Sequence, residues 1–266
     1  MSFQYGEQRW HLITLIRSFL NINSREGVQV MKDDIFLKQI QANGLCSKVY
    51  KKGEFIISNW KNNYSNIFVE EGILKMTISN AEGLTFTLQH IQGRILILST
   101  SIFNDKAMCK YNLEVVSDTA KLYFLTIDNL TTFMAKSTNI MRYVIDCLEK
   151  QLTFVWSKLC DFSVHGKCGA LCGQLLVWTY LFGEKQMNGT ITIELIATLQ
   201  DLGDSCGISH VASVSRMLSN LKKEKVIVIE NGKIKILKLD ILKINAPKIE
   251  EWFALNERQK WEKINY

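Results

Sequence analysis

Alternation of hydrophobic and polar residues dominates the chain between about residues 44 and 128. Runs rich in Ile, Leu, Val, Phe and Thr show it, namely "EFIISNW", "NIFVEEGILKMTIS", "LTFTLQHI", "RILILSTSIF" and "LEVVSDTAKLYFLTI". Such alternation is typical of strands with one buried face. Gly53, Gly72, Gly83 and Gly93 separate the runs, and "NAEG" has the composition of a hairpin turn. We therefore predict six to eight short antiparallel strands that form a sandwich or barrel.

Helical periodicity flanks this strand region. A short helix is predicted from Asp34 to about Asn43, ending at Gly44. From Asn129 to Phe162 there is neither Gly nor Pro, and the apolar residues are spaced three and four apart. They are Met141, Val144, Leu148, Leu152, Val155, Leu159 and Phe162. This spacing predicts one long helix with a seam for a partner helix.

Ile145, Phe154 and Trp156 add apolar surface that we place outside this seam. A helix with more than one apolar face needs more than one neighbour. We expect the long helix to pack on the strand region and on its own copy in a dimer. The alternative is a long core helix inside one domain.

A helix-rich region follows His165-Gly166. "KCGALCGQLLVWTYLFG" is predicted to be a helix that Gly183 ends, and "GTITIEL" a short strand. "KVIVIENGKIKIL" is predicted to be a hairpin, because Asn-Gly is the preferred two-residue turn between alternating strands. The remaining tail is predicted to be helical, with Pro247 near a helix start.

The stretch "TLQDLGDSCGISHVASVSRMLSNLKK" between this strand and this hairpin predicts two helices joined at Gly207. In the first helix we expect Leu199 and Leu202 to point inward and Cys206 to end it. In the second, at about 100° per residue, one face is apolar. It gathers Val211, Val214, Leu218 and Leu221. The opposite face carries Ser209, Ala212, Ser213, Arg216, Asn220 and Lys223.

This opposite face suits the major groove of DNA. Its small residues allow the backbone to come close, and Arg216 can make a bidentate contact to guanine. Ser209 is expected to cap the helix, whose free N–H groups favour a phosphate. Lys233 and Lys235 of the hairpin, which would form a wing, are available to phosphates. The order of helix, Gly turn, helix and hairpin predicts a winged helix-turn-helix; a structural helical hairpin with a solvated basic face is the alternative.

Two sets of contacts follow from these interpretations. The predicted DNA contacts are Ser209, His210, Val211, Ala212, Ser213, Ser215, Arg216, Asn220, Lys222, Lys223 and Lys233. The predicted dimer contacts are Met141, Val144, Leu148, Leu152, Val155 and Leu159.

The composition adds few constraints. A net charge of +6 over 266 residues permits an acidic partner without requiring one. The seven cysteines form no C-x-x-C pair, which favours buried free thiols in a reducing, cytoplasmic protein, with Cys168 and Cys172 as small core residues. We find no apolar run long enough for a membrane helix and no signal peptide. No nucleophile–base set, metal spacing or phosphate loop indicates an enzyme.

The α+β chain thus divides into four parts. Residues 1–30, with a short amphipathic helix from Arg9 to Leu20, form an N-terminal extension. Residues 31–128 form an antiparallel β-roll, 129–165 the long dimerisation helix, and 166–266 the winged helix-turn-helix domain. Purine-rich codons for "REG" would lie a ribosome-binding distance before Met31, so we hypothesise that Met31 is the native start. A real N-terminal helix is the alternative.

The order of roll, long helix and winged helix-turn-helix resembles the family of the cyclic-AMP receptor protein and the fumarate–nitrate regulator. The likeness runs from about Asp34 to about Phe253 and is strongest after Asp161. "DFSVHGKCGALCGQLL", "LGDSCGISHVASVSRMLSNLKKEKVIV" and "APKIEEWF" carry it there, and "NLEVVSDTA" carries it in the roll. The resemblance implies a bacterial activator that binds a palindromic promoter site as a homodimer and helps RNA polymerase to bind. Arg216 falls on the family's base-reading arginine.

The chain also departs from the family pattern. Val211 and Ala212 stand where most members have polar base readers, which leaves the target sequence open. Tyr111 falls at about the position of the arginine that holds a cyclic nucleotide's phosphate, and no Glu lies near, so we expect no cyclic AMP. The N-terminal cysteines of iron–sulfur members are missing, and His90 has no evident partner for haem. An unidentified small effector, in the roll or between the domains, stays open.

Two classes of function therefore compete. The first is a DNA-binding transcription regulator that needs no cyclic AMP. The second is an effector-binding sensor whose helical domain contacts a protein partner. Arg216, Lys222 and Lys223, together with the lack of acidic residues on the outward face, favour the first.

Overall fold

The computed structural model describes residues 25–56, 64–98, 111–195 and 197–256. The predicted helix from Arg9 to Leu20 lies outside these residues. Helix α2 (Arg25–Ala42) runs continuously through Met31 and starts earlier than the predicted Asp34. It ends as expected, at a turn in which Gly44 has a positive φ of 71°.

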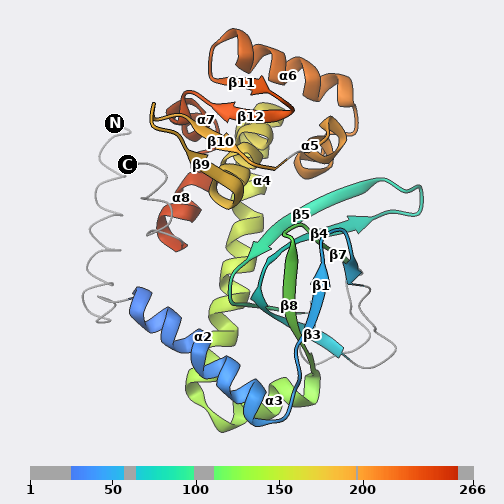
Figure 1. Ribbon diagram of the computed structural model, residues 1–266, viewed down its shortest axis with the longest axis vertical. Helices are drawn as coiled ribbons and strands as arrows, with labels where there is room; N and C mark the ends of the chain where they lie inside the picture. The colour runs from blue at the N-terminus through green and yellow to red at the C-terminus, as the bar shows by residue number, and fades with distance from the viewer. Residues whose placement is uncertain (1–24, 57–63, 99–110, 196, 257–266) are drawn as a thin grey trace.

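Within the described ranges, eight short strands follow α2 and form the roll (Figure 1). They are β1 (Lys48–Lys51), β2 (Phe55–Ile56), β3 (Tyr64–Glu71), β4 (Ile73–Ser79), β5 (Thr85–Gln92), β6 (Ile95–Ile97), β7 (Asn112–Val115) and β8 (Thr119–Thr126). All their pairings are antiparallel, in two four-stranded sheets of order β1-β8-β3-β6 and β2-β7-β4-β5. The predicted antiparallel sandwich is confirmed; β1 was missed because its residues are mostly exposed and show no apolar alternation.

The period of two along the strands explains how the roll sits under the helices. In β8, Leu122 points between the two sheets, whereas Tyr123 and Leu125 point the other way. This outer face packs against Phe36 of α2 and Tyr143 of the long helix. Both faces of one sheet are therefore buried, one by the second sheet and one by helices.

The prediction of one uninterrupted helix from Asn129 is wrong for its first part, which forms a separate helix. The structure has α3 (Ile127–Lys136) and then α4 (Thr138–Phe182), separated at Ser137. Ser137 is extended, with φ −151°, and its hydroxyl accepts a hydrogen bond from the backbone N of Ile140, so it ends one helix and caps the next. Gly166, with φ 61° and ψ −151°, kinks α4 where the sequence predicted a break.

The second half of α4 enters a domain of mixed structure. Its other elements are β9 (Gly183–Lys185), β10 (Ile191–Ile193), α5 (Leu199–Cys206), α6 (Val211–Lys223), β11 (Ile227–Glu230), β12 (Lys233–Ile236), α7 (Leu239–Asn245) and α8 (Pro247–Asn256). The strands form one sheet of order β11-β12-β10-β9. Gly183 ends α4 as predicted, but the chain continues directly into β9, which we did not predict.

Helix α4 is shared by the two parts of the molecule (Figure 1). Its first half packs on α2, α3 and the roll, and its second half packs on α7 and α8. Across the described ranges, none of the helices is long and apolar enough to span a membrane.

Candidate nucleic-acid interface and dimer helix

Helix α6 separates an apolar face from a polar one, as its sequence predicts. Val214, Leu218 and Leu221 are buried in the domain core, and Val211 is half-buried beside them. The exposed residues are Ser209, His210, Ala212, Ser215, Arg216, Asn220, Lys222 and Lys223, while Ser213 is half-buried. The structure thus brings the predicted contacts of this helix to one outer surface or its edge, except Val211, which lies beside the core face. Figure 1 shows α6 at the end of the molecule away from the roll.

The start of α6 differs from the prediction. His210, not Ser209, is the N-cap residue, and no side chain caps the helix. The helix begins at Val211, and the backbone N of Ser213 donates to the backbone O of His210 at 2.9 Å. The side chain of His210 therefore provides no cap for the N–H groups that precede Ser213, and these are the groups that an anion such as a phosphate would meet.

Helix α5 supports α6 through a tight glycine turn. Gly207 adopts the left-handed conformation, φ 67° and ψ 30°, and its N–H donates to the backbone O of Gly203. This geometry favours glycine because other residues rarely adopt it. Leu202 and Cys206 are buried as predicted, but the inward placement of Leu199 is wrong, since it is 38% exposed at the first position of the helix.

The hairpin of β11 and β12 has the predicted turn. Asn231 and Gly232 both have positive φ, 52° and 77°, as a type I′ turn requires. Lys233, the first residue of β12, is not free to contact a phosphate, because its ammonium forms an ion pair with Glu194. A phosphate contact by Lys233 would therefore have to open this pair.

The exposed apolar face of α4 is the other candidate interface. It is continuous over six turns and consists of Met141, Ile145, Leu148, Leu152, Val155, Trp156, Leu159 and Phe162. Leu152 is 51% and Trp156 58% exposed, values unusual for such side chains in a monomer. Ile145 and Trp156, which we had placed outside the seam, belong to it.

Val144 does not belong to the exposed face. It is fully buried within the protomer, in the cluster that α2, α3 and the roll form with the start of α4. The dimer contact predicted for Val144 is therefore wrong. Periodicity placed Val144 correctly on an apolar side, but α4 is covered there by its own chain. Phe154, the third residue we placed outside the seam, is also buried, against Trp252 of α8.

A small open cleft, with a cavity volume of about 60 Å³, lies between the roll and the C-terminal domain. Strand β5 supplies Gln89 and Ile91, α4 supplies Lys150 and Phe154, and α8 supplies Trp252. Its walls are mainly apolar, with a few polar side chains, but its volume is well below that of a usual small-molecule pocket. The sequence alone did not indicate this cleft, because its walls come from three distant segments.

Tyr111 and His90, the two residues weighed as possible cofactor contacts, are both packed against other side chains of the protein. Tyr111 is buried in the core between the two sheets of the roll. His90 meets the rings of Trp178 and Phe182 edge-on, and burial lowers the pKa of its imidazole to about 3. Among the described residues, no group of three or more His, Cys, Asp or Glu side chains is arranged to hold a metal.

Of the cysteines described, Cys147, Cys172 and Cys206 are buried, but Cys46, Cys160 and Cys168 are exposed, contrary to the prediction of buried thiols.

Comparison with known proteins identifies the domain that contains α5 and α6. Residues 170–243 match the family model of the Crp-like helix-turn-helix domain. The chain is 39% identical over 231 residues to the listeriolysin regulatory protein of Listeria monocytogenes, an alignment that covers 86% of this chain and 97% of that protein. The chain belongs to the Crp/FNR family of transcription regulators.

Other members of the family are more distant. The anaerobic regulatory protein of Bacillus subtilis is 26% identical over 66% of this chain and 73% of its own length. A Crp/FNR-family regulator of Thermus thermophilus has the same fold, with a TM-score of 0.62 and 18% identity over 76% of this chain and 98% of that one. A cyclic nucleotide-binding domain protein of Listeria monocytogenes also has this fold, with a TM-score of 0.62 and 16% identity. The match covers 78% of this chain and 98% of that one. The listeriolysin regulatory protein, the anaerobic regulatory protein and the Thermus protein are regulators, as the sequence predicted for this chain.

Proposed function

We propose that this Crp/FNR-family regulator is an activator that binds a palindromic promoter site as a homodimer, without cyclic AMP. The observation that supports DNA reading most directly is the outer face of α6. It is exposed, small at its start, basic further along, and free of acidic residues from Ser209 to Lys223. This composition suits close approach to a base edge by the backbone and a guanine contact by Arg216.

The apolar face of α4 supports the homodimer. The face is too large and too regular to be left in water, and the spacing of its residues suits a second, parallel copy of the helix. Two copies related by a two-fold axis would present two α6 helices, which is why we propose a palindromic site. The activator role and a contact with RNA polymerase follow the family resemblance, and transcription in vitro with purified polymerase tests both.

The burial of Tyr111 supports independence from cyclic AMP. By the family resemblance, Tyr111 falls at about the position where nucleotide binders place an arginine, and its aromatic side chain is packed in the core of the roll. A phosphate would lack its guanidinium partner there. Titration calorimetry with cyclic AMP is expected to give no binding heat, and saturable binding would contradict this part of the proposal.

The test of the whole proposal is selection from a pool of random duplex DNA at physiological salt without added ligand. We expect enrichment of a two-fold symmetric site with half-sites about one helical turn apart. The matched control is Arg216→Ala, which should lose preference at one base pair in each half-site. Failure of the wild-type protein to enrich any site, both alone and with cell extract added, would contradict the proposal and favour the alternative of a protein partner.

The cleft beside β5 is a candidate site for a small effector, should the protein need one to bind DNA. If the protein enriches a site only in the presence of extract, an effector is required, and the cleft is the place where we would look for it. Lys150→Glu would then be expected to weaken the effect of the extract, because Lys150 supplies positive charge to the cleft wall.

A further inference from the structure

Helix α5, which supports the recognition helix, is held at both ends by lysines from outside its own domain. Lys75 lies on β4 of the roll, and Lys158 lies on the half of α4 that packs on the roll. Between these two lysines, α5 rests on strand β5 (Figure 1). Helix α5 thus meets the roll near both of its ends and packs on β5 between them.

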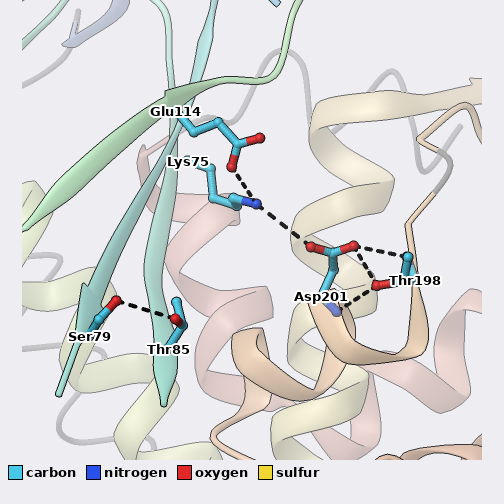
Figure 2. Close-up of polar contacts among 6 residues, drawn as sticks. All are labelled: Lys75, Ser79, Thr85, Glu114, Thr198 and Asp201. Carbon is cyan, nitrogen blue, oxygen red and sulfur yellow. Dashed lines mark hydrogen bonds and ion pairs between the residues drawn. The ribbon is translucent and has the colours of Figure 1, made fainter. Parts of the chain in front are cut away.

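The N-terminal end is held through Asp201. One carboxylate oxygen of Asp201 closes the capping box of α5, accepting from the backbone N of Thr198 at 3.0 Å and from its hydroxyl at 2.6 Å. The other oxygen lies 3.7 Å from the ammonium of Lys75, which also pairs with Glu114 of β7 at 2.6 Å. Figure 2 shows Lys75 between the two carboxylates. Asp201, the N3 residue of the capping box, is therefore also the residue that joins this end of α5 to the roll.

The C-terminal end is held through Lys158. Its ammonium donates to the backbone O of Ser205 in α5 at 3.1 Å. It also donates to the backbone O atoms of Thr87 and Leu88 in β5, at 3.2 and 3.3 Å. Ser205 is in the last turn of α5, where carbonyl groups lack helical partners and a positive charge is favourable. One side chain thus joins the end of the supporting helix to the edge of the roll.

The turn after α5 continues the contact. The ring of Phe86 in β5 lies under Gly207, so a Cβ atom at that position would be 3.5 Å from it. The ammonium of Lys158 lies 5.4 Å from the centre of the same ring. Apolar packing at the turn brings the two parts together, whereas directional bonds at the two ends of α5 define its orientation.

We propose that Lys75 and Lys158 are positioning residues for DNA binding, which fix α5 on the roll and thereby aim α6. This inference rests on the proposed DNA-binding function. The contacts use the side of α5 that faces the roll and leave the outer face of α6 exposed, so they present the recognition helix instead of covering it. Any change of shape in β4 or β5 would be passed to α6 through these two lysines.

The first test is Lys158→Met in the full-length protein, which keeps the length of the side chain but removes its hydrogen bonds. We expect about a tenfold loss of affinity for the selected site, because affinity scales with the fraction of molecules in the competent orientation. Amide hydrogen exchange in α5 should become faster, while exchange in β3 and β8 and the melting temperature stay close to wild type. Unchanged or tighter DNA binding by Lys158→Met would overturn the positioning role of Lys158, whatever the exchange in α5.

The second test separates the two halves of the Lys75 ion pair. Asp201→Asn keeps an oxygen for the capping box but removes the charge that faces Lys75, and we expect a two- to threefold loss of affinity, since the pair is half-exposed and of modest strength. Glu114→Gln is the matched control inside the roll and should bind DNA as the wild type does. Lys75→Arg should retain affinity and Lys75→Met should lose it. Equal affinities for Asp201→Asn and wild type would overturn this link.

The two proposals fail in different ways. If the wild-type protein enriches no DNA site, the proposed function is wrong, but hydrogen exchange of α5 still shows whether Lys158 holds it on the roll. If the wild-type protein binds its site and Lys158→Met binds equally well, the DNA-binding function stands and the positioning role is wrong.

Discussion

Asp161, in the middle of α4, caps the helix that begins at Pro247. Its carboxylate oxygens accept hydrogen bonds from the backbone N of Lys248 at 3.0 Å and of Ile249 at 2.9 Å. Pro247 has no N–H, so these are the first two donors of α8, and they find their acceptor on another helix. Asp161 is 1% exposed, and burial raises the pKa of its carboxyl group despite the two hydrogen bonds.

Removal of this cap should destabilise the DNA-binding domain. We expect Asp161→Ala to lower its free energy of unfolding by about 2 kcal/mol, because a buried N–H group at Ile249 and a partly buried one at Lys248 lose their acceptor. Urea unfolding followed by tryptophan fluorescence measures the change. Asp161→Asn, which retains one acceptor oxygen, should lose less, and an equal loss in both variants would show that the hydrogen bonds are not the cause.

A charge on the apolar face of α4 should separate the dimer. Leu148→Asp places a carboxylate in the middle of this face, and burying it unpaired against a second copy is costly. We expect a monomer in analytical ultracentrifugation and loss of high-affinity DNA binding. Asn139→Asp, which adds the same charge at an exposed position near the start of α4, should remain a dimer. A Leu148→Asp variant that still sediments as a dimer would show that the interface lies elsewhere.

Arg216 and Lys222 should contribute differently to DNA binding. Arg216→Ala is expected to cost about 1–3 kcal/mol at the specific site and to relax preference at one base pair in each half-site. Lys222→Ala, on the edge of the same surface, should weaken binding to all sequences and reduce the slope of affinity against salt. Binding titrations over a series of salt concentrations distinguish the two. Identical behaviour of both variants would mean that Arg216 contacts only phosphates.

Lys158 should make stability depend on pH in the alkaline range. Burial lowers the pKa of its ammonium from 10.5 to about 8, so the folded state releases a proton that the unfolded state still holds between these values. A group whose pKa is lower in the folded state than in the unfolded state stabilises the fold at pH values above its unfolded-state pKa. This stabilisation is lost as the pH falls through the folded-state pKa. The free energy of unfolding of the wild type, relative to Lys158→Met, should therefore rise by about 2 kcal/mol from pH 8 to about pH 9.5. Parallel curves for the two proteins would contradict this.

The turn at Gly207 should not tolerate a side chain. Gly207→Ala forces a left-handed conformation on alanine and places its Cβ against Phe86, which should cost about 1–2 kcal/mol. Gly232→Ala is a suitable comparison, because Gly232 also has a positive φ but has open space around it. Thermal unfolding measures the loss of stability in each variant. A larger loss for Gly207→Ala than for Gly232→Ala would give the contribution of the contact with Phe86.

The sequence by itself determined the elements that local chemistry controls. Alternation predicted the strands of the roll, and glycines predicted the turns at Gly207 and Gly232 and the kink at Gly166. Periodicity sorted α6 into a core face and an outer face. These features were predictable because each depends on backbone preference and on a pattern within a few residues of the chain.

Tertiary structure alone decided which partner each side chain meets. Periodicity placed Val144 and Leu148 on apolar sides of one helix, but only the packing of α2 and the roll shows that Val144 is covered within the protomer and Leu148 is not. Lys233 looked free until the fold placed Glu194 beside it. No pattern in the sequence singled out Lys158, whose ammonium is surrounded by carbonyl groups that β5 and α5 supply in the fold. A sequence shows the chemistry that each residue offers, whereas burial and pairing depend on segments that meet only when the chain is folded.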